Sequence, residues 1–339
     1  MMINRRLLSG SLVAGLLAAC SRPERPKDSG APPLTKLRLA TDWRAEAEHG
    51  GFYQALATGE YSRRGLDVQI IQGGPGVNVP QLLASGAADF GIGSNSFIVL
   101  NLAAEKAPVT AVMSAFQKDP QVLIAHPDAG IAGIADMKGH PILLADASIT
   151  AFWVWLKAKY GFTDAQVRKY TFNSAPFLAD KRAVQQGYVT SEPYTIEKEA
   201  GIKPAVFLLA DNGYPGYAAM VLARNALIAD RAPVVQAFVD ASAAGWKSYL
   251  NGDAAPADAL IRKDNPEMTQ DTLDQARAKL KRYGIVESGD SATGGIGAMT
   301  DARWKTFFDM ASEHGIYPKT LDYRSAYTLD FLPKLESAP

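Results

Sequence analysis

Side chains that could recognise a small molecule follow two strand-like runs in the first hundred residues, 36–40 and 88–93. The set comprises Asp42, Trp43, His49, Ser94, Asn95 and Ser96. Loops at the carboxyl ends of parallel strands form the ligand crevice of open α/β sheets. Aromatic faces with a few aimed carboxylates, amides and hydroxyls suit a flat heteroaromatic ring. This part of the chain therefore predicts a binding site for such a ring.

A second set of the same character lies further along the chain. It comprises Asp146, Ser148, Trp153, Glu192, Tyr214 and Tyr217. A carboxylate that follows a buried strand is costly unless it is paired, which makes Glu192 the foremost site candidate. Carboxylates also accept the N–H donors of an aminopyrimidine-like edge. Arg44 is the only strong anion-binding candidate in these loops, so the pattern favours a neutral or cationic heterocycle over an oxyanion.

Each of these residues also has a structural interpretation. The two tryptophans could fill the cores of lobes, and the polar run 94–96 could cap the helix that follows it. Asp42 could be a turn residue and His49 a helix-start residue. Glu46 and Glu48 are expected at the rim of the site.

The elements that must position these residues alternate between strand and helix. Strand-like runs at 36–40, 66–71 and 88–93 are separated by helix-like segments and by short connections that contain glycine. A similar succession begins near residue 134. This rhythm predicts an α/β fold with mostly parallel sheets, in which two lobes enclose a ligand cleft. We expect lobe 1 to contain residues 36–125 and 218–339, and lobe 2 residues 126–217.

The first twenty residues have the pattern of an export signal. Residues 1–6 are basic, residues 7–19 form an apolar run, and Cys20, the only cysteine of the chain, follows Leu17-Ala18-Ala19. The apolar run is shorter than the ~20 residues that a membrane-spanning helix needs. The pattern resembles a bacterial lipobox, which implies removal of residues 1–19 and lipid attachment, including palmitate, at Cys20. The alternatives are an ordinary signal peptide and, because of Arg5-Arg6, a twin-arginine signal.

The segment after Cys20 is rich in proline and poor in apolar residues, so residues 20–35 are expected to form a flexible tether. The charges of the chain balance, with 35 basic and 35 acidic residues, so there is no basic excess to suggest nucleic-acid binding. The body contains no cysteine and the four histidines are widely spaced, so we expect no metal site and no cofactor.

Several motifs in order resemble one family. They are Gly59-Glu60-Tyr61, Gly65-Leu66-Asp67-Val68, the run from Gln81 to Gly91, Asp136-Met137-Lys138-Gly139 and Ser191-Glu192-Pro193-Tyr194. Together they are similar to the NMT1/THI5 and sulfonate-binding group of type II periplasmic substrate-binding proteins, over about residues 36–335. The run from Asp42 to Tyr53 is most similar to the thiamine-pyrimidine branch. The resemblance implies a two-lobed protein that binds a small molecule and delivers it to a membrane permease.

One branch of this superfamily is an enzyme that builds the thiamine pyrimidine from pyridoxal phosphate and its own histidine. Its Schiff-base lysine aligns with Gly93 and its sacrificial histidine with Phe97. Its cysteine-rich motif has no counterpart, because residues 205–225 contain no cysteine. Schiff-base chemistry needs an amine and the iron site needs ligands, so we expect no catalytic residues here.

The resemblance therefore implies an exported, lipid-anchored, monomeric binding component of an ABC importer on the periplasmic side of a bacterial membrane. Its partners would be a permease and an ATPase. A thiamine pyrimidine precursor, such as a formylaminopyrimidine or hydroxymethylpyrimidine, is the leading ligand. Riboflavin, nitrate and sulfonate remain alternatives, as does a role in sensing a ligand for a membrane partner.

Overall fold

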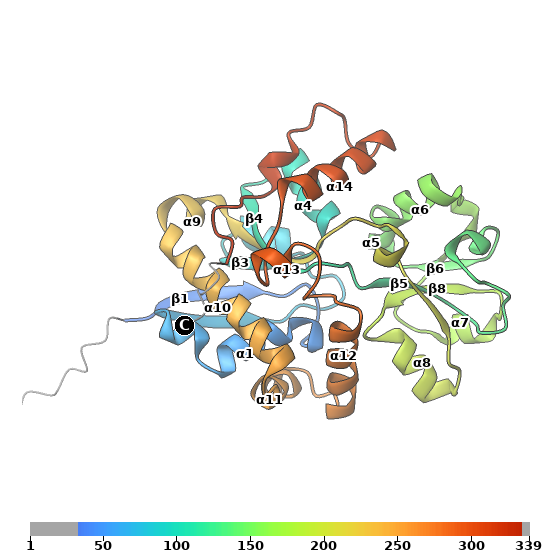
Figure 1. Ribbon diagram of the computed structural model, residues 1–339, viewed down its shortest axis with the longest axis horizontal. Coiled ribbons are helices and arrows are strands. Elements are labelled where there is room, and N and C mark those ends of the chain that lie inside the picture. Colours follow the sequence, from blue (N-terminus) through green and yellow to red (C-terminus); the bar gives the residue numbers. More distant parts are fainter. Residues whose placement is uncertain (1–32, 334–339) are drawn as a thin grey trace, which may run out of the picture. The chain divides into compact units, whose positions relative to one another are not determined.

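The polypeptide forms two five-stranded sheets, each covered by helices (Figure 1). The structure, a computed structural model, describes residues 33–333. The signal segment 1–19, Cys20 and most of the proposed tether lie outside the described residues. None of the helices formed by residues 33–333 is both long enough and apolar enough to cross a bilayer.

The first sheet has the strand order β2-β1-β3-β10-β4. Its strands are β1 (Thr35–Ala40), β2 (Leu66–Ile71), β3 (Phe90–Asn95), β4 (Val109–Phe116) and β10 (Ala218–Arg224). Strand β1 pairs in parallel with β2 and β3, whereas β10 is antiparallel to both β3 and β4. The sheet is therefore mixed rather than mostly parallel. The chain passes through the second sheet before β10, and β10 then pairs antiparallel with its neighbours in the first sheet.

The second sheet has the equivalent arrangement, in the order β7-β6-β8-β5-β9. Its strands are β5 (Gln121–Ala125), β6 (Ile142–Leu144), β7 (Val167–Lys169), β8 (Val184–Tyr188) and β9 (Ala205–Leu208). Strand β5 is antiparallel to β8 and β9, and β6 is parallel to β7 and β8. The expectation of two α/β lobes is thus confirmed.

The strand β5 corrects one detail of the expected lobes. The sequence prediction assigned residues 121–125 to lobe 1, but their backbone groups pair in the second sheet. An apolar run identifies a buried strand without identifying the sheet that it joins. We therefore propose that lobe 1 comprises residues 35–116 and 218–333, and lobe 2 residues 121–208, with connections at 117–120 and 209–217.

The helices of lobe 1 include two that fix the start of the candidate site. Helix α1 packs on α10 so closely that a Cβ on Gly245 would lie 2.2 Å from the carbonyl oxygen of Gly51. Glycine is therefore required at this crossing, where α10 packs on the first turn of α1, directly after His49. The helices are α1 (Gly50–Ala57), α2 (Glu60–Arg63), α3 (Val79–Ala84), α4 (Ser96–Ala104), α9 (Asn225–Asp230), α10 (Ala232–Asn251), α11 (Ala255–Asp264), α12 (Gln270–Arg282), α13 (Ser291–Gly294) and α14 (Asp301–Glu313), with 3-10 turns η1 (Ala47–His49) and η5 (Tyr323–Ala326).

The helices of lobe 2 lie around the second sheet (Figure 1). They are α5 (Asp146–Ile149), α6 (Phe152–Tyr160), α7 (Ala175–Ala179) and α8 (Glu192–Ala200), with 3-10 turns η2 (Ile134–Met137), η3 (Asp164–Gln166) and η4 (Ala210–Asn212). Helix α8 begins with Glu192 and a proline in its first turn and ends at Gly201, which has φ of 67°. This arrangement follows the usual preference for proline at the start of a helix and glycine at its end.

One arginine of α14 holds both connections between the sheets. The guanidinium of Arg303 donates to the carbonyl oxygen of Gln117 in one connection. It also donates to the carbonyl oxygens of Pro215, at 3.0 Å, and Gly216, at 3.1 Å, in the other. The two connecting segments are therefore tied to each other through α14.

Candidate functional site

Three of the residues singled out from the sequence, Asp42, Ser94 and His49, are joined by hydrogen bonds. The Asp42 carboxylate, at the end of β1, accepts a hydrogen bond of 2.5 Å from the hydroxyl of Ser94, at the end of β3. The Nε2 atom of His49 lies 3.1 Å from the other carboxylate oxygen. In the tautomer that carries its hydrogen on Nε2, the imidazole donates this bond to the carboxylate oxygen. The imidazole is buried and its Nδ1 atom has no hydrogen-bond partner among the described residues.

Two further carboxylates stand beside this group in lobe 1. Glu48 lies on η1, is buried, and accepts a hydrogen bond from the hydroxyl of Thr190, which belongs to lobe 2. Glu46 precedes η1. Burial raises its pKa well above the ordinary value, and the negative charges of Glu48, Asp42 and Glu192 raise it further. Burial also raises the pKa of Glu48, while the bond from Thr190 partly opposes this rise.

Glu192 supplies a fourth carboxylate, from the start of α8. It accepts a bond of 2.8 Å from the backbone N–H of Tyr188 and one of 3.2 Å from the hydroxyl of Tyr170. Burial raises the pKa of Glu192, and these two donors act in the opposite direction. The pKa of Tyr188 is raised well above its usual value, first by burial and then by surrounding carboxylates that include Asp42, Glu46 and Glu48. The two lobes therefore meet at a cluster of acidic groups.

This cluster favours ligands that carry positive charge or N–H donors. A carboxylate with a raised pKa gains from a donor or cation placed beside it, because such a neighbour stabilises the charged form. An anionic ligand would meet repulsion from the same groups. The electrostatics of the cleft thus agree with the residue types noted in the sequence.

An aromatic contact between the lobes joins Trp43 to a side chain that the sequence prediction missed. The rings of Trp43 and Phe172 lie 4.9 Å apart between centroids, with a tilt of 45°. Trp43 follows β1 of lobe 1, and Phe172 follows β7 of lobe 2. Tyr170 continues the row, with its ring centroid 5.3 Å from that of Phe172.

Little enclosed space remains where the lobes meet. A cavity of about 20 Å³ lies among Glu46, Glu48, Thr190 and Leu273, which is room for about one water molecule. The side-chain amide of Gln275 on α12 closes this region by donating a bond of 2.6 Å to the carbonyl oxygen of Thr190. This region therefore encloses no space for a heteroaromatic ring in the present arrangement of the lobes.

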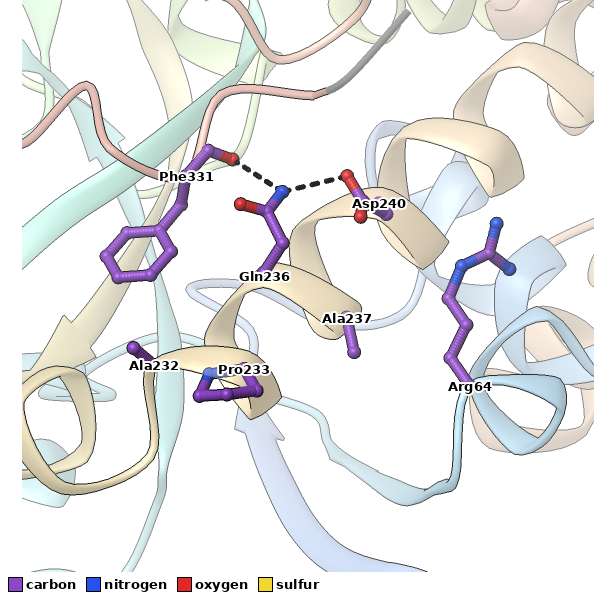
Figure 2. A pocket seen from close by; sticks show the side chains of 7 residues that line it. All are labelled: Arg64, Ala232, Pro233, Gln236, Ala237, Asp240 and Phe331. Carbon is purple, nitrogen blue, oxygen red and sulfur yellow. Dashed lines mark hydrogen bonds between the residues drawn. The ribbon is translucent and has the colours of Figure 1, made fainter. Parts of the chain in front are cut away.

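A larger hollow lies elsewhere and contains none of the predicted site residues. It has a volume of about 520 Å³ and is formed by α10 with Arg64 and Phe331 (Figure 2). Gln236 donates to Asp240 at 2.9 Å within it, and Arg64 is paired with Glu60. All of its lining residues come from lobe 1, and it lacks the converging carboxylates and hydroxyls of the cleft. The cleft is therefore the better candidate for ligand recognition.

Several predicted residues of the first set have structural partners. The side-chain oxygen of Asn95 accepts from the backbone N–H groups of Phe97 and Ile98 and so caps α4. Ser96 is fully buried, and its hydroxyl bonds both the N–H and the carbonyl of Tyr217. Asn95 thus fixes the start of α4, and Ser96 joins it to the residue that precedes β10.

Residues of the second set are also distributed over the lobes. Trp153 is fully buried and donates to Asp164 at 2.8 Å, so it packs inside lobe 2. The Asp146 side chain is 76% exposed and pairs with Lys169. Ser148 is buried within α5, and its backbone N–H donates to the carbonyl oxygen of Ala145.

The two tyrosines near the second connection are buried. Tyr217 donates to Asp290 and accepts a bond of 2.9 Å from the backbone N–H of Thr300, while the guanidinium of Arg303 lies 4.1 Å from its ring centroid. Tyr214 packs against Trp155 at 5.3 Å, and its buried hydroxyl has no partner among the described residues. Tyr217 thus supports the connection between the lobes.

Comparison with known proteins identifies the family. A family model described as NMT1/THI5 like matches residues 46–255, which is more than half of the chain. The chain belongs to the NMT1/THI5-like family. The resemblance inferred from the motifs is thereby confirmed.

Two curated relatives of this NMT1/THI5-like protein are similar over nearly their whole length. The riboflavin-binding protein RibY of Chloroflexus aurantiacus is 24% identical, with 98% of this chain and 99% of the relative covered. A formylaminopyrimidine-binding protein of Halalkalibacterium halodurans is 23% identical, with coverage of 91% and 93%. Both relatives are named as binding proteins.

A solved structure extends the comparison to the fold. The periplasmic aliphatic sulphonate-binding protein SsuA of Escherichia coli has a TM-score of 0.67 at 15% identity, with 91% of this chain and 96% of that chain covered. At this identity the likeness concerns the fold alone. It agrees with two α/β lobes in the NMT1/THI5-like protein described here.

The positions that align with catalytic residues of the synthase branch are part of the first lobe's packing. Phe97 is buried, with its ring 4.8 Å from that of Phe307. A Cβ on Gly93 would lie 3.2 Å from Leu222, so a larger side chain there would require its neighbour to move. Within residues 33–333, no group of three or more His, Cys, Asp or Glu side chains is placed to hold a metal ion.

Sequence reasoning missed Thr190, Tyr170 and Phe172. Thr190 follows β8 at the same end as Glu192, so the rule that selected Glu192 could have found it. The two aromatic residues follow β7, which has only three residues, two of them the exposed Arg168 and Lys169. Such a short polar strand has no detectable alternation, and its carboxyl end could not be located in advance.

Proposed function

We propose that this protein is the extracytoplasmic solute-binding component of an ABC importer, and that it captures a small heteroaromatic ligand. The observation that carries the proposal is the position of carboxylates from both lobes where the lobes meet. Glu48 of lobe 1 bonds Thr190 of lobe 2. Glu192 of lobe 2 bonds Tyr170, whose ring continues through Phe172 to Trp43 of lobe 1. Acidic acceptors next to an aromatic face suit a flat ring with N–H donors. A thiamine pyrimidine precursor, such as a formylaminopyrimidine or hydroxymethylpyrimidine, is the leading ligand.

The proposed mechanism follows from the connections between the lobes. Separation of the lobes about residues 117–120 and 209–217 admits the ligand, and closure surrounds it with groups from both sides. Closure is favoured to the extent that the ligand binds the closed form more tightly than the open one. The closed protein would then present both lobes to a permease, which works with an ATPase.

Riboflavin is the second candidate ligand. It is favoured by the similarity to the riboflavin-binding protein RibY over almost the entire chain. Its fused ring system also offers a flat aromatic face, but its size requires wider separation of the lobes than a single pyrimidine does.

The remaining parts of the proposal concern location and chemistry. We propose that Cys20 is lipid-modified and anchors a monomeric protein to the periplasmic side of a bacterial membrane. We also propose that the protein is not an enzyme, since Gly93 and Phe97 replace the reactive side chains of the synthase branch. An absorbance change on addition of pyridoxal phosphate would count against this last point.

A thermal-shift panel tests the proposed ligand class. It would contain hydroxymethylpyrimidine, a formylaminopyrimidine, riboflavin, taurine and nitrate. A ligand present at 100 times its Kd stabilises the folded protein by ~2.7 kcal/mol, which produces a readily measured rise in Tm. A rise with the pyrimidines supports the proposal. A rise with taurine or nitrate and none with any heteroaromatic compound overturns it.

A further inference from the structure

Phe172 is an aromatic side chain held in an unusual setting. It is 52% exposed, the highest value among the three exposed large apolar side chains of residues 33–333. Its φ is 59°, in the left-handed region that side chains other than glycine rarely adopt. Folding therefore keeps an apolar ring in water at a cost in backbone energy. Such features concentrate where a residue serves binding rather than packing.

The loop that carries Phe172 is fixed on both sides of it. The N–H of Tyr170 bonds the carbonyl of Leu144 at 2.9 Å. The side chain of Asn173 accepts from the backbone N–H of Ala175 at 2.9 Å, and Ser174 accepts from Gln185 at 3.0 Å. The strained backbone is thus imposed by its surroundings, while the ring itself remains accessible.

The position of the ring relates it to both lobes. Its centroid lies 4.9 Å from that of Trp43 in lobe 1 and 5.3 Å from that of Tyr170 in its own lobe. The Tyr170 hydroxyl in turn donates to Glu192. Tyr170 therefore links the ring of Phe172 to the carboxylate of Glu192, which can accept N–H donors.

We propose that Phe172 is a ligand-stacking residue of lobe 2, which closes together with Trp43 on the two faces of a flat aromatic ligand. This inference rests on the proposed function and names a specificity-determining residue of that site. Carbon atoms in contact lie about 3.5–4.0 Å apart, so a ring between two others needs centroids roughly 7 Å apart. The two rings are now 4.9 Å apart and tilted by 45°, so they must separate by ~2 Å and turn toward parallel to hold a flat ring between them.

The same arrangement selects against other ligands. A nitrate or an aliphatic sulfonate offers no aromatic face to the two rings. A pyrimidine or an isoalloxazine does, and its edge can reach the carboxylates. The aromatic pair and the acidic cluster would thus act on different features of one ligand.

Titration calorimetry on the full-length protein tests the role of Phe172, with hydroxymethylpyrimidine and riboflavin as probes. The variants are Phe172→Ala, Phe172→Leu and Phe172→Tyr, and the control is Leu329→Ala, which removes an apolar side chain that is 36% exposed. Loss of an aromatic pair predicts an affinity about 2- to 12-fold weaker for the alanine variant. We expect leucine to be intermediate and tyrosine and the control to match wild type.

The Tm of each variant separates binding from structure. Because the ring is half in water, the alanine variant should retain the wild-type Tm without ligand. An alanine variant that binds the probe as tightly as wild type overturns the role of Phe172 and leaves the proposed function intact. An alanine variant whose affinity falls only in proportion to a lowered Tm also overturns the role of Phe172 and leaves the proposed function intact. Absence of binding of both probes to wild type refutes the proposed function and the stacking role together.

Discussion

The burial of the Asp119 carboxyl, in a connection between the lobes, can be tested quantitatively by the pH dependence of stability. Asp119 lies in the connection between β4 and β5, is 1% exposed, and accepts a bond of 3.0 Å from the N–H of Gln121. Burial raises the pKa of its carboxyl from 3.8 to about 7, against the smaller opposing effect of that bond. Replacement by asparagine keeps the shape and the accepting oxygen but removes the ionisation.

The direction of the effect follows from proton linkage. A carboxyl with a raised pKa binds its proton more tightly in the folded state, so its contribution to stability is full below pH 3.8 and is lost as the pH rises to about 7. Each pKa unit corresponds to ~1.36 kcal/mol, so the rise corresponds to ~4 kcal/mol. The free energy of unfolding of Asp119→Asn, relative to wild type, should therefore increase by up to ~4 kcal/mol between pH 3.8 and pH 8.

Urea unfolding of both proteins at intervals from pH 4 to pH 8 measures this difference. Glu46, Glu48 and Glu192 also titrate with raised pKa values, but they are present in both proteins and cancel in the comparison. Asp146→Asn is the control, because it makes the same substitution at a carboxyl that is 76% exposed. Parallel curves for wild type and Asp119→Asn would refute the reasoning.

Three other predictions concern the assignment of residues to the cleft or to packing. Glu192→Ala should weaken binding of hydroxymethylpyrimidine with little change in the circular dichroism spectrum, and unchanged affinity in calorimetry would remove Glu192 from the site. Thr190→Val removes the hydroxyl that donates to Glu48 between the lobes, so the closed form should lose about 1–3 kcal/mol. A larger radius of gyration in X-ray scattering is expected, and an unchanged one would argue against this contact. Trp153→Phe should lower the free energy of unfolding by about 1–3 kcal/mol in urea titrations without affecting ligand affinity. Reduced ligand affinity at an unchanged free energy of unfolding would instead assign Trp153 to the ligand site.

The sequence was sufficient for the fold class and the family because their determinants are local. Alternating strands and helices, and glycines at their ends, are visible along the chain without knowledge of tertiary contacts. The run at Gln121–Ala125 shows the limit of this approach. Its composition predicts a buried strand, but only the pairing with β8 and β9 assigns it to the second sheet.

The candidate site was predictable to the extent that strand ends could be located. Asp42, His49 and Ser94 were selected by that rule, and the structure joins their side chains by hydrogen bonds. Ser96 satisfied the same rule, yet its hydroxyl is used by the backbone of Tyr217, a residue 121 positions away. Such a long-range partner cannot be inferred from one sequence.

An equilibrium titration of the wild-type protein tests the central claim most directly. Calorimetry at neutral pH would compare hydroxymethylpyrimidine with taurine, which carries a sulfonate. The acidic and aromatic cleft predicts saturable one-to-one binding of the pyrimidine and no binding of taurine. Saturable binding of taurine, with no heat from the pyrimidine or from riboflavin, would contradict the proposed recognition of a heteroaromatic ligand.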